Sequence, residues 1–219
     1  MTTTIQQDFI NLAIRCEALC FGQFTLKSGR VSPYFFNAGL FNTGLALSSL
    51  GQLYAKRLVD SGIDFDVIFG PAYKGIPLAC ATTMALAEDL DREVPYSFNR
   101  KEVKDHGEGG QLVGASVANK RVIIVDDVMT AGTAVNEAMH ILTAAQAQVV
   151  GILIALDRQE RGQQITSAVQ EVQARYGIPV FSLMTFSDIF HYVKESDKID
   201  LAVLNDMQAY REKYGVIAL

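Results

Sequence analysis

Apolar residues along the chain follow two different spacings, and these spacings predict the order of helices and strands. They recur about every three to four positions over 5–19 and over 47–58, as on one face of a helix. Between these segments, residues 21–41 carry aromatic and β-branched side chains interrupted by Gly29 and Pro33. This pattern is typical of two short strands joined by a turn.

From residue 66 onward, short apolar runs alternate with segments of helical periodicity. Strands are predicted at 66–70, 94–98, 121–127, 148–157 and 178–184. Helices are predicted at 76–90, 134–146, 163–177, 187–196 and 201–215. Strands that alternate with helices indicate a parallel sheet, and near-continuous apolar strands indicate that helices cover both of its faces.

One connection breaks this alternation. The segment 100–116, RKEVKDHGEGGQLVGAS, contains four glycines and charges of both signs, without hydrophobic periodicity. Loops of this length without structure of their own are uncommon in compact domains and are usually functional or disordered. We therefore expect a functional loop here, with a solvated flexible loop that has no function as the alternative.

The composition indicates a single globular domain over 1–219. Of the 219 residues, 49% are hydrophobic and 20% are charged, which is enough apolar material for a buried core. A net charge of -5 argues against general nucleic-acid binding. The longest apolar run, 149–156, is too short to cross a bilayer, and no export signal is visible, so we expect a cytoplasmic protein without a membrane partner.

The most informative strand end lies in the stretch VIIVDDVMTAGT, residues 122–133. Four apolar residues run into Asp126 and Asp127, and a turn of small residues then leads into a helix. Backbone N–H groups at a helix N-terminus bind phosphate, and carboxylates accept hydrogen bonds from a sugar diol or help to hold a cation. The pattern favours a ribose 5-phosphate. Helix capping is the alternative, but it explains one acid poorly and two acids worse.

Two further strand ends carry unusual residues. The segment FGPAYKGIP, residues 69–77, has the glycine spacing with which a nucleotide-binding P-loop starts, but Ile-Pro stands where Lys-Ser/Thr is required. Its Lys74 lies on a tight turn that suits an anionic group. The segment LDRQERG, residues 156–162, presents Arg158, whose planar fork suits a carboxylate or a polar base edge. A surface salt bridge is an equally good interpretation of Arg158.

Together these motifs resemble the type I phosphoribosyltransferases, and among them the orotate phosphoribosyltransferases. VDDVMTAGT is similar to the phosphoribosyl pyrophosphate (PRPP) motif, which alone indicates only the larger family. The orotate branch is indicated by FTLKSGR, PYFFNAG, GPAYKG, RKEVKDHGEGG and LDRQERG, which follow the family's order over residues 24–162.

The resemblance implies the family's α/β fold, a central, mostly parallel sheet flanked by helices. A small hood subdomain would comprise about 1–45 with C-terminal segments, and the PRPP-binding core about 62–185. The segment 100–116 would be the flexible catalytic loop. In a homodimer, this loop would complete the active site of the neighbouring subunit.

The resemblance also implies an activity. The 5-phosphoribosyl group of PRPP would be transferred to orotate, giving orotidine 5'-monophosphate and pyrophosphate in the de novo biosynthesis of UMP, with Mg2+ as cofactor. A phosphoribosyltransferase for another base and a PRPP-sensing regulator without turnover are the alternatives. The regulator is disfavoured because no basic, DNA-binding segment is visible.

By the same resemblance, six residues are catalytic candidates: Lys74, Arg100, Lys104, His106, Asp126 and Asp127. The PRPP site would comprise these six and Lys27, Tyr73, Lys101, Val128, Met129, Thr130, Ala131, Gly132, Thr133 and Ala134. The orotate pocket would comprise Lys27, Phe35, Phe36, Thr130 and Arg158. Asp127 is the candidate metal ligand, with Mg2+ held mainly by PRPP.

Overall fold

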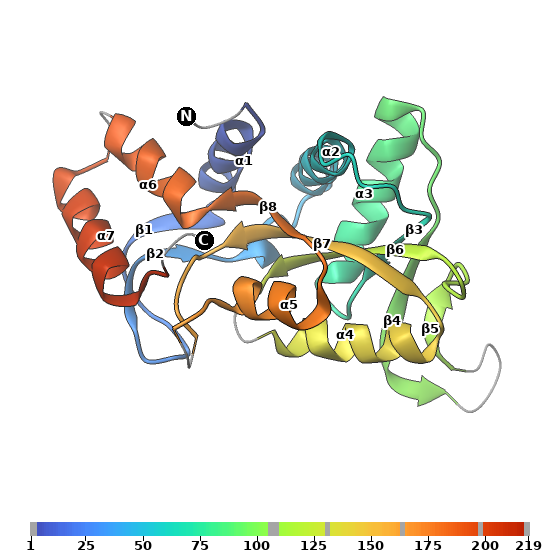
Figure 1. Cartoon of the computed structure of the whole chain (residues 1–219). Coiled ribbons are helices and arrows are strands. Elements are labelled where there is room, and N and C mark those ends of the chain that lie inside the picture. Colours follow the sequence, from blue (N-terminus) through green and yellow to red (C-terminus); the bar gives the residue numbers. More distant parts are fainter. Residues whose placement is uncertain (1–3, 105–109, 130–131, 163–164, 197–198, 217–219) are drawn as a thin grey trace.

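A six-stranded sheet forms the centre of the molecule, with helices on both faces (Figure 1). The computed structural model describes residues 4–104, 110–129, 132–162, 165–196 and 199–216. The strand order is β5-β4-β3-β6-β7-β8, and every neighbouring pair is parallel except β4 with β5. The strands are β3 Val67–Gly70, β4 Tyr96–Lys104, β5 Gly110–Gly114, β6 Arg121–Val128, β7 Gln148–Asp157 and β8 Val180–Thr185. The predicted α/β fold with a mostly parallel sheet is confirmed.

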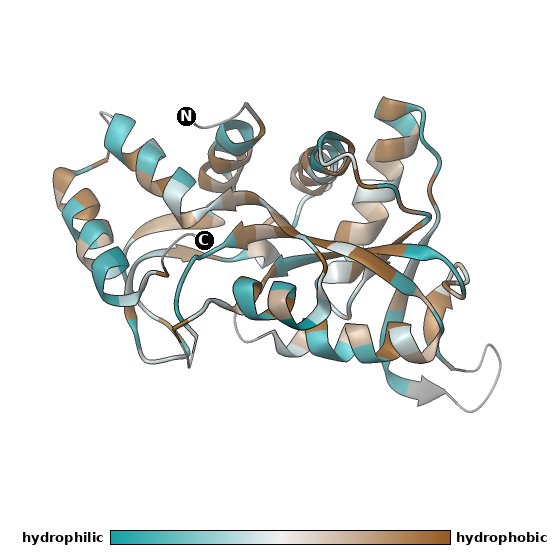
Figure 2. Cartoon of the chain, in the orientation of Figure 1, coloured by the Kyte–Doolittle hydropathy of each residue, from teal (hydrophilic) through white to brown (hydrophobic). Residues whose placement is uncertain are grey.

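Helices cover the two faces of this sheet and bury its apolar strands. Helices α2 (Gly44–Asp60) and α3 (Gly75–Leu90) lie on one face, and α4 (Thr133–Ala144) and α5 (Ala168–Tyr176) lie on the other (Figure 1). Neighbouring strand residues such as Ile123 and Ile124 point to opposite faces, and each is fully buried in a different core cluster. Figure 2 shows the apolar residues concentrated in the central strands. Burial on both faces explains why these strands are apolar at nearly every position.

A second, smaller unit is formed by elements from the first and last parts of the chain. Strands β1 (Leu19–Thr25) and β2 (Val31–Phe36) form an antiparallel pair. Helices α1 (Thr4–Arg15), α6 (Phe186–Glu195) and α7 (Leu201–Tyr214) pack beside this pair and the sheet edge at β8 (Figure 1). The division into a hood and a PRPP-binding core stays a prediction. No helix within the described ranges is long and apolar enough to cross a membrane.

The expectation of an unstructured loop over 100–116 is wrong for the described part of that segment. Strand β4 continues to Lys104, and β5 pairs with it antiparallel, with Ser97 opposite Gly114 and Lys104 opposite Gly110. Residues 105–109 lie outside the described ranges. Periodicity did not indicate these strands, because the edge ribbon has exposed residues such as Lys101 and Glu102 and needs no apolar face there.

Two predicted helix boundaries also differ from the structure. The first helix ends at Arg15, and Leu19 opens strand β1 instead of continuing the helical face. Helix α5 begins at Ala168, because the Ser167 hydroxyl and the Gln170 side chain form a capping box there. The helices predicted from the apolar spacing were both too long, because they included residues of the flanking turns.

The close approach of α2 to α3 depends on Gly51. This residue is buried, and a Cβ added to it would lie 2.5 Å from the carbonyl oxygen of Ala81. Any side chain at this position would therefore push the two helices apart.

We expect Gly51→Ala to lower the free energy of unfolding by about 1–3 kcal/mol, because overpacking strains the helix contact. Urea unfolding measures this change. Gly44→Ala, in the same helix with nothing within 4 Å of the added Cβ, is the matched control. It should leave stability equal or slightly higher, because alanine favours helix more than glycine does. Equal losses in both variants would contradict the role of Gly51.

Candidate active site

The three unusual strand ends meet at one edge of the sheet. Strands β3, β6 and β7 are adjacent and parallel, so their carboxyl ends point the same way. The Lys74 turn follows β3, the two acids lie at the end of β6, and Arg158 follows β7. In open α/β sheets, ligands bind at this edge.

Asp126 and Asp127 lie within β6, and each is only 8% exposed. From the sequence we expected them to stand just past the buried segment, but they are the last two buried residues of the strand. The N–H of Asp127 donates to Oδ1 of Asp126 at 2.9 Å, and the Tyr54 hydroxyl donates to the Asp126 carbonyl at 2.7 Å. Helix α4 begins after Gly132 without a side-chain cap, so the capping alternative is excluded for both acids.

Burial changes the protonation of this site. Burial and, after it, the neighbouring charge of Asp127 raise the pKa of Asp126 to about 7, against the opposing effects of a backbone hydrogen bond and Lys74. Burial also raises the pKa of Tyr54 well above its usual value, helped by both carboxylates. The phenol therefore remains protonated and keeps donating to β6.

Lys74 supplies a positive charge to the acidic pair. Its Nζ lies 2.5 Å from Oδ2 of Asp127, and this bond joins the β3 turn to strand β6. The turn is pressed against β6, since a Cβ on Gly75 would lie 2.9 Å from the Val125 carbonyl oxygen. The N–H of Ala72 donates to Oδ1 of buried Asn99 at 2.9 Å. The turn is therefore held from both neighbouring strands, β4 and β6.

A hollow of about 240 Å³ lies between this turn and the start of α4. Its walls are Pro71, Ala72, Asn99, Lys101, Thr133, Ala134, Glu137 and Ala138. Thr133 and Ala134 are exposed in the first turn of α4, where backbone N–H groups and the helix dipole favour an anion. Nζ of Lys101 lies 5.6 Å from the ring centroid of Tyr73. The hollow thus lies between the Lys74 turn, predicted to suit an anionic group, and the turn predicted to bind a phosphate.

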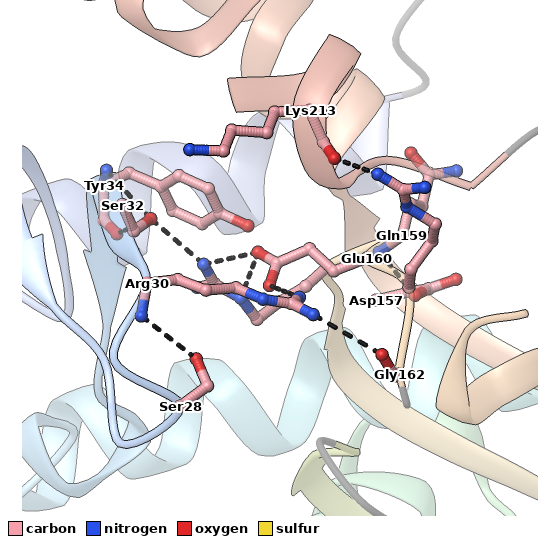
Figure 3. Close-up of polar contacts among 11 residues, drawn as sticks. Ser28, Arg30, Ser32, Tyr34, Asp157, Gln159, Glu160, Gly162 and Lys213 are labelled. Carbon is pink, nitrogen blue, oxygen red and sulfur yellow. Dashed lines mark hydrogen bonds and ion pairs between the residues drawn. The ribbon is translucent and has the colours of Figure 1, made fainter. Parts of the chain in front are cut away.

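Arg158 lies in a buried polar network. Figure 3 labels three of its neighbours in this network, Ser32, Tyr34 and Glu160. Its Nε donates to Oε1 of Glu160 at 2.8 Å, and its Nη2 lies 2.6 Å from the same oxygen. Nη2 also donates to Oγ of Ser32 at 3.1 Å, and the guanidinium carbon lies 4.3 Å from the ring centroid of Tyr34. The salt bridge considered from the sequence exists, but its side chains are only 11% and 13% exposed, so it is not a surface pair.

Three more residues predicted for the orotate pocket, Lys27, Phe35 and Phe36, are spread over the β1–β2 pair and its turn. Phe35 is 40% exposed and stacks on Phe24 at 5.5 Å. Phe36 is buried in the core against Phe9, so its ring packs away from solvent. Lys27 is exposed in the turn between the strands. Strand alternation separates the two neighbouring phenylalanines onto opposite faces.

Four predicted site groups lie outside what the structure describes. They are the side chain of Lys104 and the residues His106, Thr130 and Ala131. Arg100 is half-buried in β4, Met129 is buried after β6, and Gly132 has a positive φ of 67° before α4. The sequence did not single out Tyr54, Asn99 and Glu160. Only Glu160 carried a usable signal, since it stands two residues after Arg158.

The acidic pair fits a metal ion that arrives with a phosphorylated substrate. Within the described ranges, no group of three histidine, cysteine or acidic side chains gathers at one point. Mg2+ keeps several waters and commonly takes one or two carboxylates together with substrate phosphates. Asp126 and Asp127 can supply these carboxylates, whereas an all-protein cage would need further ligands.

The fold and this site define the class of protein. The family described as phosphoribosyl transferase domain matches residues 42–181, and the chain belongs to it.

Individual relatives indicate the branch within this family. The chain is 58% identical over 212 residues to an orotate phosphoribosyltransferase of Salmonella paratyphi A, covering 96% of this chain and 98% of the relative. It is 56% identical over 211 residues to the enzyme of the same name from Pseudomonas aeruginosa, again covering 96% and 98%. The crystal structure of orotate phosphoribosyltransferase from Francisella tularensis matches with a TM-score of 0.88 at 45% identity, covering 94% of this chain and 98% of that one. These likenesses place the chain in the orotate branch.

We expect the stability of the protein to depend on pH through Asp126. Its folded-state pKa of about 7 lies above the ordinary value of 3.8, so its contribution to stability is full below about pH 4 and is lost as the pH rises through 7. Asp126→Asn removes this dependence. Relative to the variant, wild type should lose on the order of 2 kcal/mol of unfolding free energy between pH 5 and pH 8.

Urea unfolding at both pH values, with a chelator present, measures this difference. All other titrating groups are shared by the two proteins and cancel. A difference that stays constant between the two pH values would contradict the assigned titration.

Proposed function

We propose that this protein transfers the 5-phosphoribosyl group of PRPP to orotate, giving orotidine 5'-monophosphate and pyrophosphate in UMP biosynthesis. The observation that carries the proposal is the meeting of the acidic pair, the Lys74 turn and Arg158 at one sheet edge. The names of the relatives, at 56–58% identity over nearly full length, support the same reaction.

The acidic pair suits the ribose ring of the transferred group, and the Lys74 turn suits the departing pyrophosphate. Breaking the bond to pyrophosphate leaves positive charge on the ribose ring and negative charge on the departing group. Asp126 and Asp127 would accept hydrogen bonds from the ribose hydroxyls and offset the positive charge. Lys101, which lines the hollow, and Lys74, on the turn that forms one of its walls, would hold the pyrophosphate. Mg2+, when bound, supplies further positive charge to the phosphates.

Lys74 has to leave Asp127 before it can serve the pyrophosphate. Its side chain is 58% exposed, so it can swing into the hollow at little cost in packing. The carboxylate that it releases is then available to the sugar or to Mg2+. PRPP would thus rearrange the charges of the site as it binds.

The base end of the site would be formed by Arg158, Lys27 and Phe35. Arg158 donates to polar atoms of orotate, and the exposed ring of Phe35 offers an apolar face. Thr130 and Phe36 belong to the same proposal through the family resemblance. The buried position of Phe36 favours an indirect role, in which it supports the strand that carries Phe35.

The segment 100–116 would close over the reacting groups and exclude water, which would otherwise hydrolyse PRPP. Arg100, Lys104 and His106 would act there, in the neighbouring active site of a homodimer. A cytoplasmic location is part of the proposal, and the three unpaired cysteines support a reducing compartment.

The direct test is turnover by the purified protein with PRPP, Mg2+ and orotate, followed as loss of orotate absorbance. We expect turnover with orotate and none with adenine or uracil, because Arg158 and Lys27 suit an anionic base. Turnover with another base but not with orotate would reassign the substrate. Binding of PRPP without turnover of any base would favour the regulator instead.

Lys104→Ala should lower kcat at least about 100-fold and change the KM for PRPP much less, if this lysine stabilises the leaving pyrophosphate mainly in the transition state. Steady-state kinetics with both substrates separate the two effects. Lys120→Ala, an exposed position before β6, serves as the control and should match wild type. Parallel losses in kcat and PRPP affinity would contradict this role for Lys104.

A further inference from the structure

Glu160 has no assigned part in the proposed chemistry, yet it lies at the centre of a charged cluster that includes Arg158. The cluster comprises Arg30, Arg158 and Glu160. Oε1 of Glu160 accepts a hydrogen bond from Nε of Arg158 and forms an ion pair with its Nη2. Oε2 of Glu160 lies 3.5 Å from Nη1 of Arg30 (Figure 3). The Glu160 side chain is 13% exposed, so this ion pairing takes place largely out of water. A buried carboxylate that bridges two arginines needs an explanation beyond a surface charge contact.

The contacts of Arg158 fix both the plane of its guanidinium and the rotation of the group within that plane. The ring of Tyr34, 4.3 Å away, restricts the plane of the group. Glu160 and Ser32 restrict rotation within that plane, because they bind Nε and Nη2. The hydrogen bonds to Glu160 and Ser32 use Nε and Nη2 of this guanidinium. The phenol of Tyr210 also lies beside the pair, and its pKa is raised by burial and by the Glu160 charge and lowered by Arg158. Glu160 and Ser32 thus fix the Nε–Nη2 edge of the arginine.

Glu160 is itself held by the C-terminal segment. It forms an antiparallel bridge with Gly215, and the N–H of Arg161 donates to the Tyr214 carbonyl at 2.8 Å. The N–H of Val216 donates to the Gln159 carbonyl at 2.9 Å. The guanidinium of Arg30 lies 4.7 Å from the Tyr214 ring centroid and donates to the Gly162 carbonyl at 3.5 Å. These backbone bonds place the Glu160 carboxylate at a defined position relative to β7.

The charge of the cluster suits one anionic ligand. Two arginines and one carboxylate leave a net charge of +1, and orotate carries one carboxylate. With Glu160 present, Arg158 can remain buried and oriented before the base arrives, so binding costs less side-chain entropy. Without Glu160, the guanidinium would lack both its counter-charge and the contact that sets its rotation.

We propose that Glu160 is a positioning residue for base binding, which holds one edge of Arg158 so that the Nη1 edge meets orotate. This inference rests on the proposed function, because it takes Arg158 as a ligand of the base. Glu160 itself does not touch orotate. The opposite arrangement, in which Glu160 occupies the site of the substrate carboxylate and must be displaced, makes the opposite kinetic prediction.

Glu160→Gln tests the proposal in steady-state kinetics. The KM for orotate should rise roughly tenfold, whereas the KM for PRPP should stay within about twofold of wild type. Glu160→Asp keeps the charge but draws it back by one methylene, so its effect on the orotate KM should be intermediate. It also provides a testable variant if the glutamine variant does not fold, because Arg158 then retains a counter-charge.

A double-mutant cycle separates positioning from a general structural role. In an Arg158→Lys background, which lacks the fork, Glu160→Gln should raise the orotate KM no more than about twofold further. Asp66→Asn is the matched control, since Asp66 binds Arg121 at the opposite edge of the sheet. It should lower thermal stability without changing either KM.

Each remaining outcome has a distinct meaning. If wild type does not turn over orotate, the proposed function and this inference both fail. If wild type turns over orotate and Glu160→Gln lowers the orotate KM, Glu160 competes with the substrate and positioning is wrong. Equal changes in both KM values, or independent effects of the two substitutions, would also overturn it.

Discussion

Parallel pairing of β3, β6 and β7 is the constraint on which the rest of the structure depends. Parallel strands end at the same edge of the sheet. Residues from three segments that lie far apart along the chain therefore meet there. The same pairing requires helices on both faces, and these helices begin at the ligand edge. One rule of sheet geometry therefore places the acids, the Lys74 turn and Arg158 within one site.

Charge burial is the main energetic problem that this arrangement creates. Asp126 and Asp127 lie within the buried strand, and water cannot fully solvate either of them. The protein meets this cost by raising the pKa of Asp126 and by pairing Asp127 with Lys74. In the proposed function, the hydroxyls of the substrate and its metal ion would take over both roles.

Around Arg158, the cost of burying a charge is met by a different means. Arg158 is balanced by Glu160 within the protein, and the pair is tied to β2 through Ser32 and to the C-terminal segment through Gly215. The first and last parts of the chain thus contribute to a site whose central residues lie on the sheet. Contacts among distant segments of this kind leave no periodic signal in the sequence.

The sequence by itself determined the alternation of strands and helices, the sheet class and the three strand-end motifs, since these depend on local spacing and on residue chemistry. It also singled out Asp126, Asp127, Lys74 and Arg158 by their unusual places. Only the tertiary structure decided the β4–β5 ribbon, the burial of both acids and the partner of Arg158. Edge pairing, desolvation and side-chain neighbours depend on which segments meet in space, and no local pattern of residues records that.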